Sequence, residues 1–133
     1  MESNIVLVDL VDTKKDFLFY ESMCRLRANL QALGEDLKVI LFTSAIPKEG
    51  VMDISFQVAA SMANIERKVL YIDASISNSI FANKYQTDDK FNGISQFLRG
   101  EVECSEIIYK TNINNLDMEF AGPSVTNSTE LLY

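Results

Sequence analysis

The sequence contains no histidine and no tryptophan, and its 133 residues include only two cysteines and two prolines. The lack of histidine excludes Ser-His and Cys-His nucleophile pairs and every His-containing metal site. Cys24 and Cys104 lie far apart and match no metal or redox spacing, so we expect two free structural thiols.

No apolar run approaches the roughly 20 residues that span a bilayer. The N-terminal stretch "MESNIVLVDLVD" carries acidic residues and lacks the basic region of a secretory signal. We therefore expect a cytoplasmic protein. The sequence also has no excess of basic residues, because the net charge is −7 and the isoelectric point is about 4.5. That balance argues against sequence-independent binding to nucleic acid or to anionic lipid.

What is present is a globular composition, with 47% hydrophobic residues and a length that suits one domain with a real core. Apolar periodicity and continuous apolar runs alternate along the chain, as in α/β proteins with a parallel sheet. We expect helices over 16–34, about 51–65, 93–100 and 104–110, and strands over 38–44, 67–75 and 115–122.

The stretch "TSAIPKEG" lies between a predicted strand and a predicted helix, which is the layout of a phosphate-binding loop. Such a loop normally continues with Lys and then Ser or Thr, but here Val51, Met52 and Asp53 follow Gly50. Valine cannot replace the lysine, and methionine offers Mg²⁺ no oxygen. We interpret Asp53, in the first helical turn, as an internal anion that substitutes for a nucleotide. The degenerate loop comprises Ala45, Pro47, Lys48, Glu49, Gly50, Val51, Met52 and Asp53.

Taken in order, these segments resemble the catalytic domain of bacterial tyrosine kinases of the capsule and exopolysaccharide type, which are P-loop proteins. The "TSAIPKEG" loop resembles the lead-in to the family's Walker A lysine. "ESMCRLRANLQ" resembles a Glu-x-x-Arg-x-x-Arg motif, in which Glu21 and Arg27 match and Cys24 replaces the first arginine. "KVLYIDAS" resembles a strand that ends in Asp-x-Asp, in which Asp73 matches and Ser75 replaces the second aspartate.

The resemblance implies an α/β fold, specifically a P-loop NTPase-like three-layer α/β/α domain with a short parallel sheet. Residues 1–15 are predicted to be an extended N-terminal arm, and 16–133 a single truncated doubly wound domain. The chain stops before the strand that would carry the family's Walker B aspartate, and the family's C-terminal tyrosine cluster is absent.

These departures predict a non-catalytic tyrosine-kinase-like protein that acts as an interaction or regulatory subunit in capsular or extracellular polysaccharide biosynthesis. We expect no catalytic residue, no metal site and no cofactor. Asp73 either caps the following segment or keeps a metal-binding role, and Lys48 and Glu49 are either solvated loop charges or remnants of the family loop. One alternative is an ATP-binding kinase or ATPase with a rearranged site that uses ATP and Mg²⁺. Another is a gene fragment without function that still folds.

The partners that the resemblance implies are other proteins. A homo-oligomer is expected, because a truncated sheet has an open edge, which the arm over 4–12 could cover. Glu21, Cys24 and Arg27 form either a subunit-contact motif or a solvated helix face. Further expected partners are an active kinase paralogue and the cytoplasmic segment of a membrane protein that determines polysaccharide chain length, which would recruit the chain to the inner face of the membrane.

Overall fold

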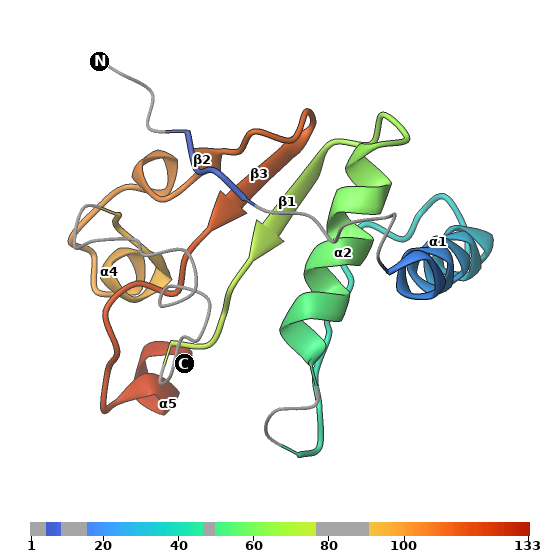
Figure 1. Cartoon of the computed structure of the whole chain (residues 1–133). Helices are drawn as coiled ribbons and strands as arrows, with labels where there is room; N and C mark the ends of the chain where they lie inside the picture. Colours follow the sequence, from blue (N-terminus) through green and yellow to red (C-terminus); the bar gives the residue numbers. More distant parts are fainter. Residues whose placement is uncertain (1–4, 9–15, 47–49, 77–90) are drawn as a thin grey trace. The chain divides into compact units, whose positions relative to one another are not determined.

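The structure is a computed structural model that describes residues 5–8, 16–46, 50–76 and 91–133 (Figure 1). The chain divides into two compact units. Unit 1 contains Met1–Val8 and Leu70–Tyr133, and unit 2 contains Asp9–Val69. The predicted division into an arm over 1–15 and one domain over 16–133 stays a prediction.

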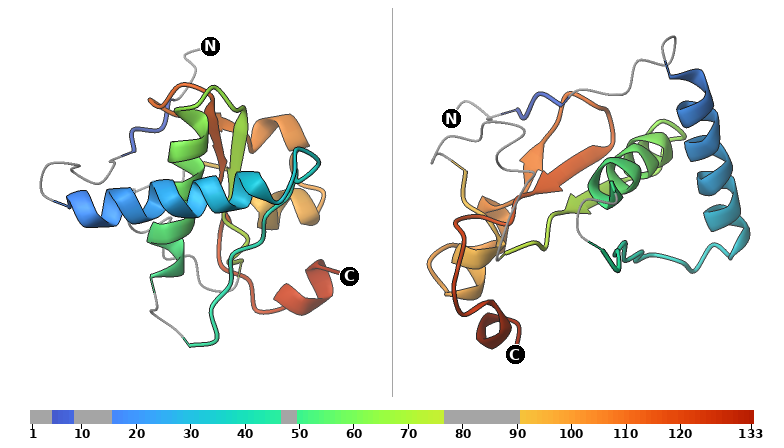
Figure 2. Two further views of the ribbon diagram at one scale, coloured as in Figure 1. Left: turned by 90° about the vertical axis from the view of Figure 1, so that its right-hand side faces the viewer. Right: turned by 60° about the horizontal axis from the view of Figure 1, so that its bottom comes forward.

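Unit 2 contains two helices, α1 (Phe17–Ala32) and α2 (Val51–Ala63). Helical spacing of apolar residues predicted both of them. On α1 the stripe formed by Phe19, Met23, Leu26 and Leu30 is buried or half-buried, whereas Leu33 just beyond the helix is exposed. α1 crosses α2 (Figure 2), and the Nη1 group of Arg27 donates a hydrogen bond of 3.2 Å to the carbonyl oxygen of Ser61.

The strand predicted over 38–44 is wrong. These residues form neither helix nor strand, and the side chains of Val39 and Leu41 are 85% and 84% exposed. The three strands that do form a sheet all lie later in the chain. An apolar run becomes a strand only when a neighbouring strand accepts its hydrogen bonds, so its own pattern does not decide the outcome.

Unit 1 is built on a three-stranded sheet with the order β1-β3-β2. β1 (Val69–Ile72) begins at the boundary between the units, and β3 (Leu116–Glu119) lies beside it in the same direction (Figure 1). β2 (Tyr109–Lys110) runs antiparallel to β3, with Tyr109 opposite Met118. The sheet is therefore mixed, and the prediction of a parallel sheet needs correction. A short loop joins β2 to β3, and so short a connection can join only antiparallel neighbours.

The predicted helix over 104–110 is a single 3₁₀ turn, η1 (Cys104–Glu106), followed by β2. The later part of the 104–110 segment has an extended backbone because it pairs with β3. Among the described residues of unit 1 are two further helices, α4 (Ile94–Leu98) and α5 (Ser128–Leu131). No helix in the described ranges is both long enough and apolar enough to cross a membrane.

The N-terminal arm extends the sheet beside β2. Val6 forms a parallel bridge with Thr111: its N–H donates to the carbonyl of Lys110 at 2.9 Å, and its carbonyl accepts from the N–H of Asn112 at 3.2 Å. Val8 exchanges two more hydrogen bonds with the Asn112 side chain, of 2.8 and 3.2 Å. The described part of the arm therefore covers the β2 side of the sheet and not the outer edge of β1.

The packing of the start of α4 against the end of β3 depends on the close approach of two glycines. A Cβ atom placed on Gly93 would lie 2.2 Å from the backbone nitrogen of Gly122, which leaves no room for a side chain. The approach lets the first N–H groups of α4 bond to the end of β3, with Ile94 donating to Phe120 at 2.9 Å. Nearby, the rings of Phe91, Tyr109 and Phe120 pack with centroid separations of 4.8 to 5.7 Å.

Candidate functional site

The candidate phosphate-binding loop leads into the N-terminus of α2. Gly50 is the N-cap and has a left-handed backbone with φ of 75°, a conformation that favours glycine. Ala45 is exposed, while Pro47, Lys48 and Glu49 lie outside the described residues. The loop therefore keeps a glycine where the chain takes a left-handed turn into α2, and the next three residues set the charge at the start of the helix.

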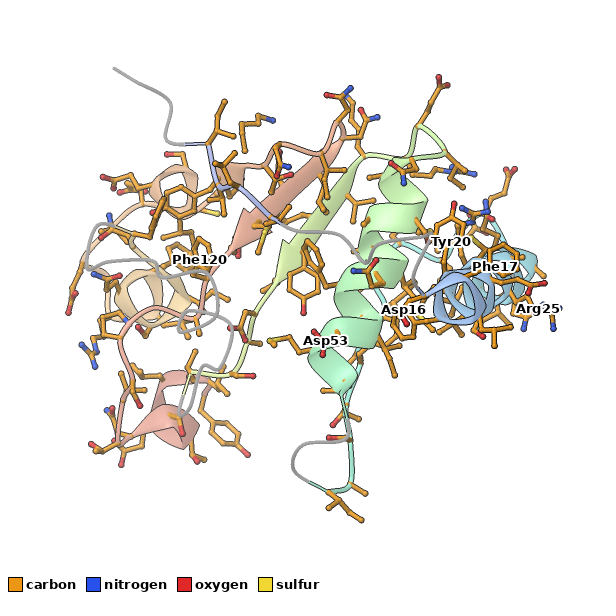
Figure 3. The ribbon with its side chains drawn as sticks, in the orientation of Figure 1. Asp16, Phe17, Tyr20, Arg25, Asp53 and Phe120 are labelled. Atoms are coloured by element: carbon orange, nitrogen blue, oxygen red, sulfur yellow. The ribbon has the colours of Figure 1, made fainter. Side chains whose placement is uncertain are left out.

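Val51 and Met52 occupy the first two positions of α2 and are half-buried, and Asp53 is exposed in the first turn. Figure 3 shows Asp53 near the N-terminal end of α2. Neither a cationic nor a hydroxyl side chain stands at these three positions. The one charge is a carboxylate, which the partial positive charge of a helix N-terminus stabilises and which repels a phosphate. The first three positions of α2 therefore carry one negative charge and no cation.

Asp73 lies immediately after β1, at the carboxyl end of a strand, where α/β proteins place functional groups. It is 8% exposed, its backbone N–H donates to the carbonyl of Glu119 at 3.0 Å, and its Oδ1 accepts the N–H of Ser75 at 3.0 Å. The carboxylate thus closes an Asx turn, which matches the capping alternative. Within the described ranges, no group of three or more Cys, Asp or Glu side chains could hold a metal ion.

Glu119 is a buried acid that the sequence analysis missed. It is 7% exposed at the end of β3, and no hydrogen bond or ion pair of its carboxylate is found within the described part of the chain. Burial raises the pKa of this carboxyl. Alternation in "LDMEF" places Glu119 on the same side of the strand as Asp117, so the sequence pattern alone does not mark it as buried.

The three residues of the α1 motif do not act as one cluster. Glu21 forms an exposed ion pair of 2.8 Å with Arg25, one turn along the helix. Cys24 is half-buried, and its hydrogen bond with Tyr20 raises the pKa of that phenol. Arg27 bonds to α2 through Ser61. Figure 3 shows Tyr20 and Arg25 on α1. Arg27 is therefore engaged within the chain, and any subunit contact by this motif stays a prediction.

Comparison with known proteins extends these observations. No protein-family model matches the chain. The tyrosine-protein kinase CpsD of Streptococcus pneumoniae is 35% identical over 119 residues, which cover 90% of this chain and 51% of CpsD. The tyrosine-protein kinase etk of Escherichia coli is 27% identical over 114 residues, which cover 84% of this chain and 16% of etk.

Solved structures agree with the sequence matches. The kinase domain of Escherichia coli ETK aligns with a TM-score of 0.77 at 29% identity, over 85% of this chain and 45% of that one. The chain is a homologue of the bacterial tyrosine-protein kinases. The VpsO kinase domain aligns with a TM-score of 0.78 at 24% identity, which supports the fold alone.

These matches confirm the predicted α/β fold of P-loop kinase domains. The chain spans about half the length of CpsD and of the solved kinase domain of ETK. The kinase relatives are named for an activity.

Proposed function

We propose that the chain is a non-catalytic, tyrosine-kinase-like subunit that works by protein–protein interaction in capsular or extracellular polysaccharide biosynthesis. The observation that supports this proposal is the start of α2. There the positions that resemble the Walker lysine and the Mg²⁺-binding hydroxyl hold Val51 and Met52, and Asp53 follows in the first turn. A P-loop kinase relies on that lysine and that metal ion at the transferred phosphoryl group.

Titration calorimetry with ATP and ADP, with and without Mg²⁺, tests the proposal. We expect weak binding or none, because the first three positions of α2 offer a nucleotide no cation, no hydroxyl ligand for Mg²⁺ and one repelling carboxylate. Micromolar, Mg²⁺-dependent binding of ATP would contradict the proposal and would favour an enzyme with a rearranged site.

A double variant tests whether Val51 and Met52 are the cause of weak nucleotide binding. Val51→Lys with Met52→Ser restores the cation and the hydroxyl, and the charge-assisted contact of the lysine is worth roughly 1.5–3 kcal/mol, or about one to two decades of affinity. Val51→Leu with Met52→Leu changes the same positions without adding a polar group and serves as the control. Equal affinities of the two double variants would show that these positions are not the reason for weak binding.

The partners in this proposal are proteins. Candidates are further copies of this chain, an active kinase paralogue, and the cytoplasmic segment of a membrane protein that determines polysaccharide chain length. That last contact would bring the chain to the inner face of the membrane. Support for a homo-oligomer comes from the first turn of α1, where Phe17 is 60% and Leu18 is 76% exposed.

A further inference from the structure

Asn92 and Gly93 form an Asn-Gly pair immediately before α4, within unit 1. The side-chain amide of an asparagine can be attacked by the backbone nitrogen of the residue that follows it. Glycine permits this attack most readily, because it has no Cβ atom to obstruct the approach and its backbone is the least restricted. Asn92 is half-buried and Gly93 is buried. The pair is therefore reactive by its sequence, and the structure around it sets the rate.

Packing requires glycine at position 93. A Cβ atom there would lie 2.2 Å from the backbone nitrogen of Gly122 and 2.6 Å from the carbonyl oxygen of Phe120. Gly93 also forms a parallel bridge with Phe120, which Figure 3 labels. Because no side chain fits at position 93, an asparagine at position 92 is always followed here by the residue that favours attack on its amide.

The side chain of Gln96 holds both reacting groups. Its Oε1 accepts the backbone N–H of Gly93 at 2.8 Å, and its Nε2 donates to Oδ1 of Asn92 at 3.2 Å. The first bond fixes the orientation of the Gln96 amide, because only its oxygen can accept an N–H. The hydroxyl of Tyr109 donates to the backbone carbonyl of Asn92 at 3.1 Å. The attacking nitrogen and the amide under attack are therefore both bound to one residue of α4.

We propose that Asn92 is a deamidation site and that Gln96 slows its reaction in the folded protein. The backbone nitrogen of Gly93 loses its proton and bonds to Cγ of Asn92, while the bond from Cγ to Nδ2 breaks. The Nδ2 group takes up a proton and leaves as ammonia, and water then opens the cyclic imide to give aspartate or isoaspartate at position 92. Both reacting groups first have to leave Gln96, so the reaction proceeds only when the start of α4 opens.

The isoaspartate product does not suit the packing at this position. It routes the main chain through the former side chain and so adds an extra carbon atom before the nitrogen of Gly93. Gly93 already lies too close to Gly122 to accept a Cβ atom, and Ser95 of α4 donates to the carbonyl of Ala121 at 3.0 Å. Deamidation therefore separates α4 from the end of β3, and the modified chain should melt at a lower temperature than the parent. The proposal goes beyond the proposed function, because it holds whether or not the chain binds a nucleotide.

Peptide mapping by mass spectrometry tests the proposal on the whole chain. The protein is incubated at physiological temperature and mildly alkaline pH, both folded and in guanidinium chloride, and the conversion of Asn92 to aspartate and isoaspartate is followed over time. Conversion should be at least roughly tenfold slower in the folded protein, because a protected group reacts only after local opening. Asn115, which is followed by the bulkier Leu116, is the internal control and should stay unchanged in both samples.

Two variants of α4 assign the protection to Gln96. Gln96→Met keeps the length of the side chain but removes both hydrogen bonds, and should raise the rate in the folded protein by roughly fivefold or more. Leu98→Gly is the matched control, because glycine weakens the same helix and leaves both hydrogen bonds in place. It should raise the rate less than Gln96→Met does. Circular dichroism establishes that each variant is folded before the incubation.

Three results would overturn the proposal. The first is the same rate at Asn92 in the folded and the denatured parent, because the structure then gives no protection. The second is a rate for folded Gln96→Met that does not exceed that of the parent or of Leu98→Gly, because the protection then does not come from Gln96. The third is the absence of conversion in the denatured chain, because the pair is then not reactive.

Discussion

Asp53 is the residue whose charge decides how the loop before α2 is interpreted. As an internal anion in the first turn, it is favoured by the helix N-terminus, and Asp53→Ser should lower stability by about 0.3–1 kcal/mol. Added sulfate should then raise the melting temperature of the variant more than that of the parent, because the freed N–H groups can accept an anion. Thermal melts with and without sulfate provide the measurement.

Asp36→Ser is the control for that comparison, because it removes an exposed aspartate from the segment after α1. If Asp53→Ser and Asp36→Ser had equal melting temperatures and equal responses to sulfate, Asp53 would be an ordinary surface residue. The left-handed backbone of Gly50 would then account for the loop without any anion.

Glu119 predicts a pH dependence of stability. Burial raises the pKa of the Glu119 carboxyl in the folded state above its ordinary value of 4.5, so the stability linked to this group is fully present below that value. It is lost as pH rises through the folded pKa, because the folded state then has to bury a charge. Glu119→Gln removes the charge and should be more stable than the parent at neutral pH, with the difference vanishing under acid conditions.

Chemical denaturation from about pH 4 to about pH 8 measures this effect. Asp117→Asn is the matched control on the same strand. Asp117 forms an ion pair of 2.9 Å with Lys110, so its replacement should not stabilise the protein at neutral pH. A stability difference between Glu119→Gln and the parent that stays constant across this range would contradict the prediction.

Arg27 connects two elements, α1 and α2, and is the main polar tie that the structure shows between them. Arg27→Ala removes its hydrogen bond to Ser61 and its half-buried stem, and should cost about 1–2 kcal/mol in the free energy of unfolding. Arg25→Ala, two residues earlier, removes only an exposed ion pair to Glu21 and should cost less than about 0.5 kcal/mol. Urea unfolding of both variants is the measurement, and equal costs would contradict the assigned role of Arg27.

At the scale of elements, the sequence was informative where a segment's own pattern decides its structure. The stripe from Phe19 to Leu30 predicted α1, and the apolar run before Asp73 predicted β1. The sequence was uninformative where a distant partner decides. Residues 38–44 read as a strand but form neither helix nor strand, and Tyr109 and Lys110 form a strand only because β3 lies opposite.

The candidate site likewise contains features that local sequence predicts and features that depend on distant partners. The lead-in to α2 and the position of Asp73 after β1 could be predicted from local spacing. The burial of Glu119 and the contact of Arg27 with Ser61, 34 positions away, could not, because both depend on how elements pack.

At the scale of the whole molecule, the exposed residues at the start of α1 predict self-association. Leu18→Lys places a charge on the surface formed by Phe17 and Leu18, and should shift the protein from an oligomer toward a monomer. Multi-angle light scattering over a range of concentrations measures the mass. Leu132→Lys, at a site that is 64% exposed in unit 1, is the control and should leave the mass unchanged. A parent that is monomeric at high concentration would contradict the prediction.

The pairing of Val8 with Asn112 joins residues that are 104 positions apart, and it therefore sets an order of events during synthesis. At usual translation speeds, roughly 5–20 seconds pass between the two residues. For that interval Val6 and Val8, which end up 5% and 3% exposed, have no strand to join. Closing so long a loop is slow compared with forming α1 or α2. Val6 and Val8 are thus synthesised before the described elements that they join and reach their final place only after those elements have been made.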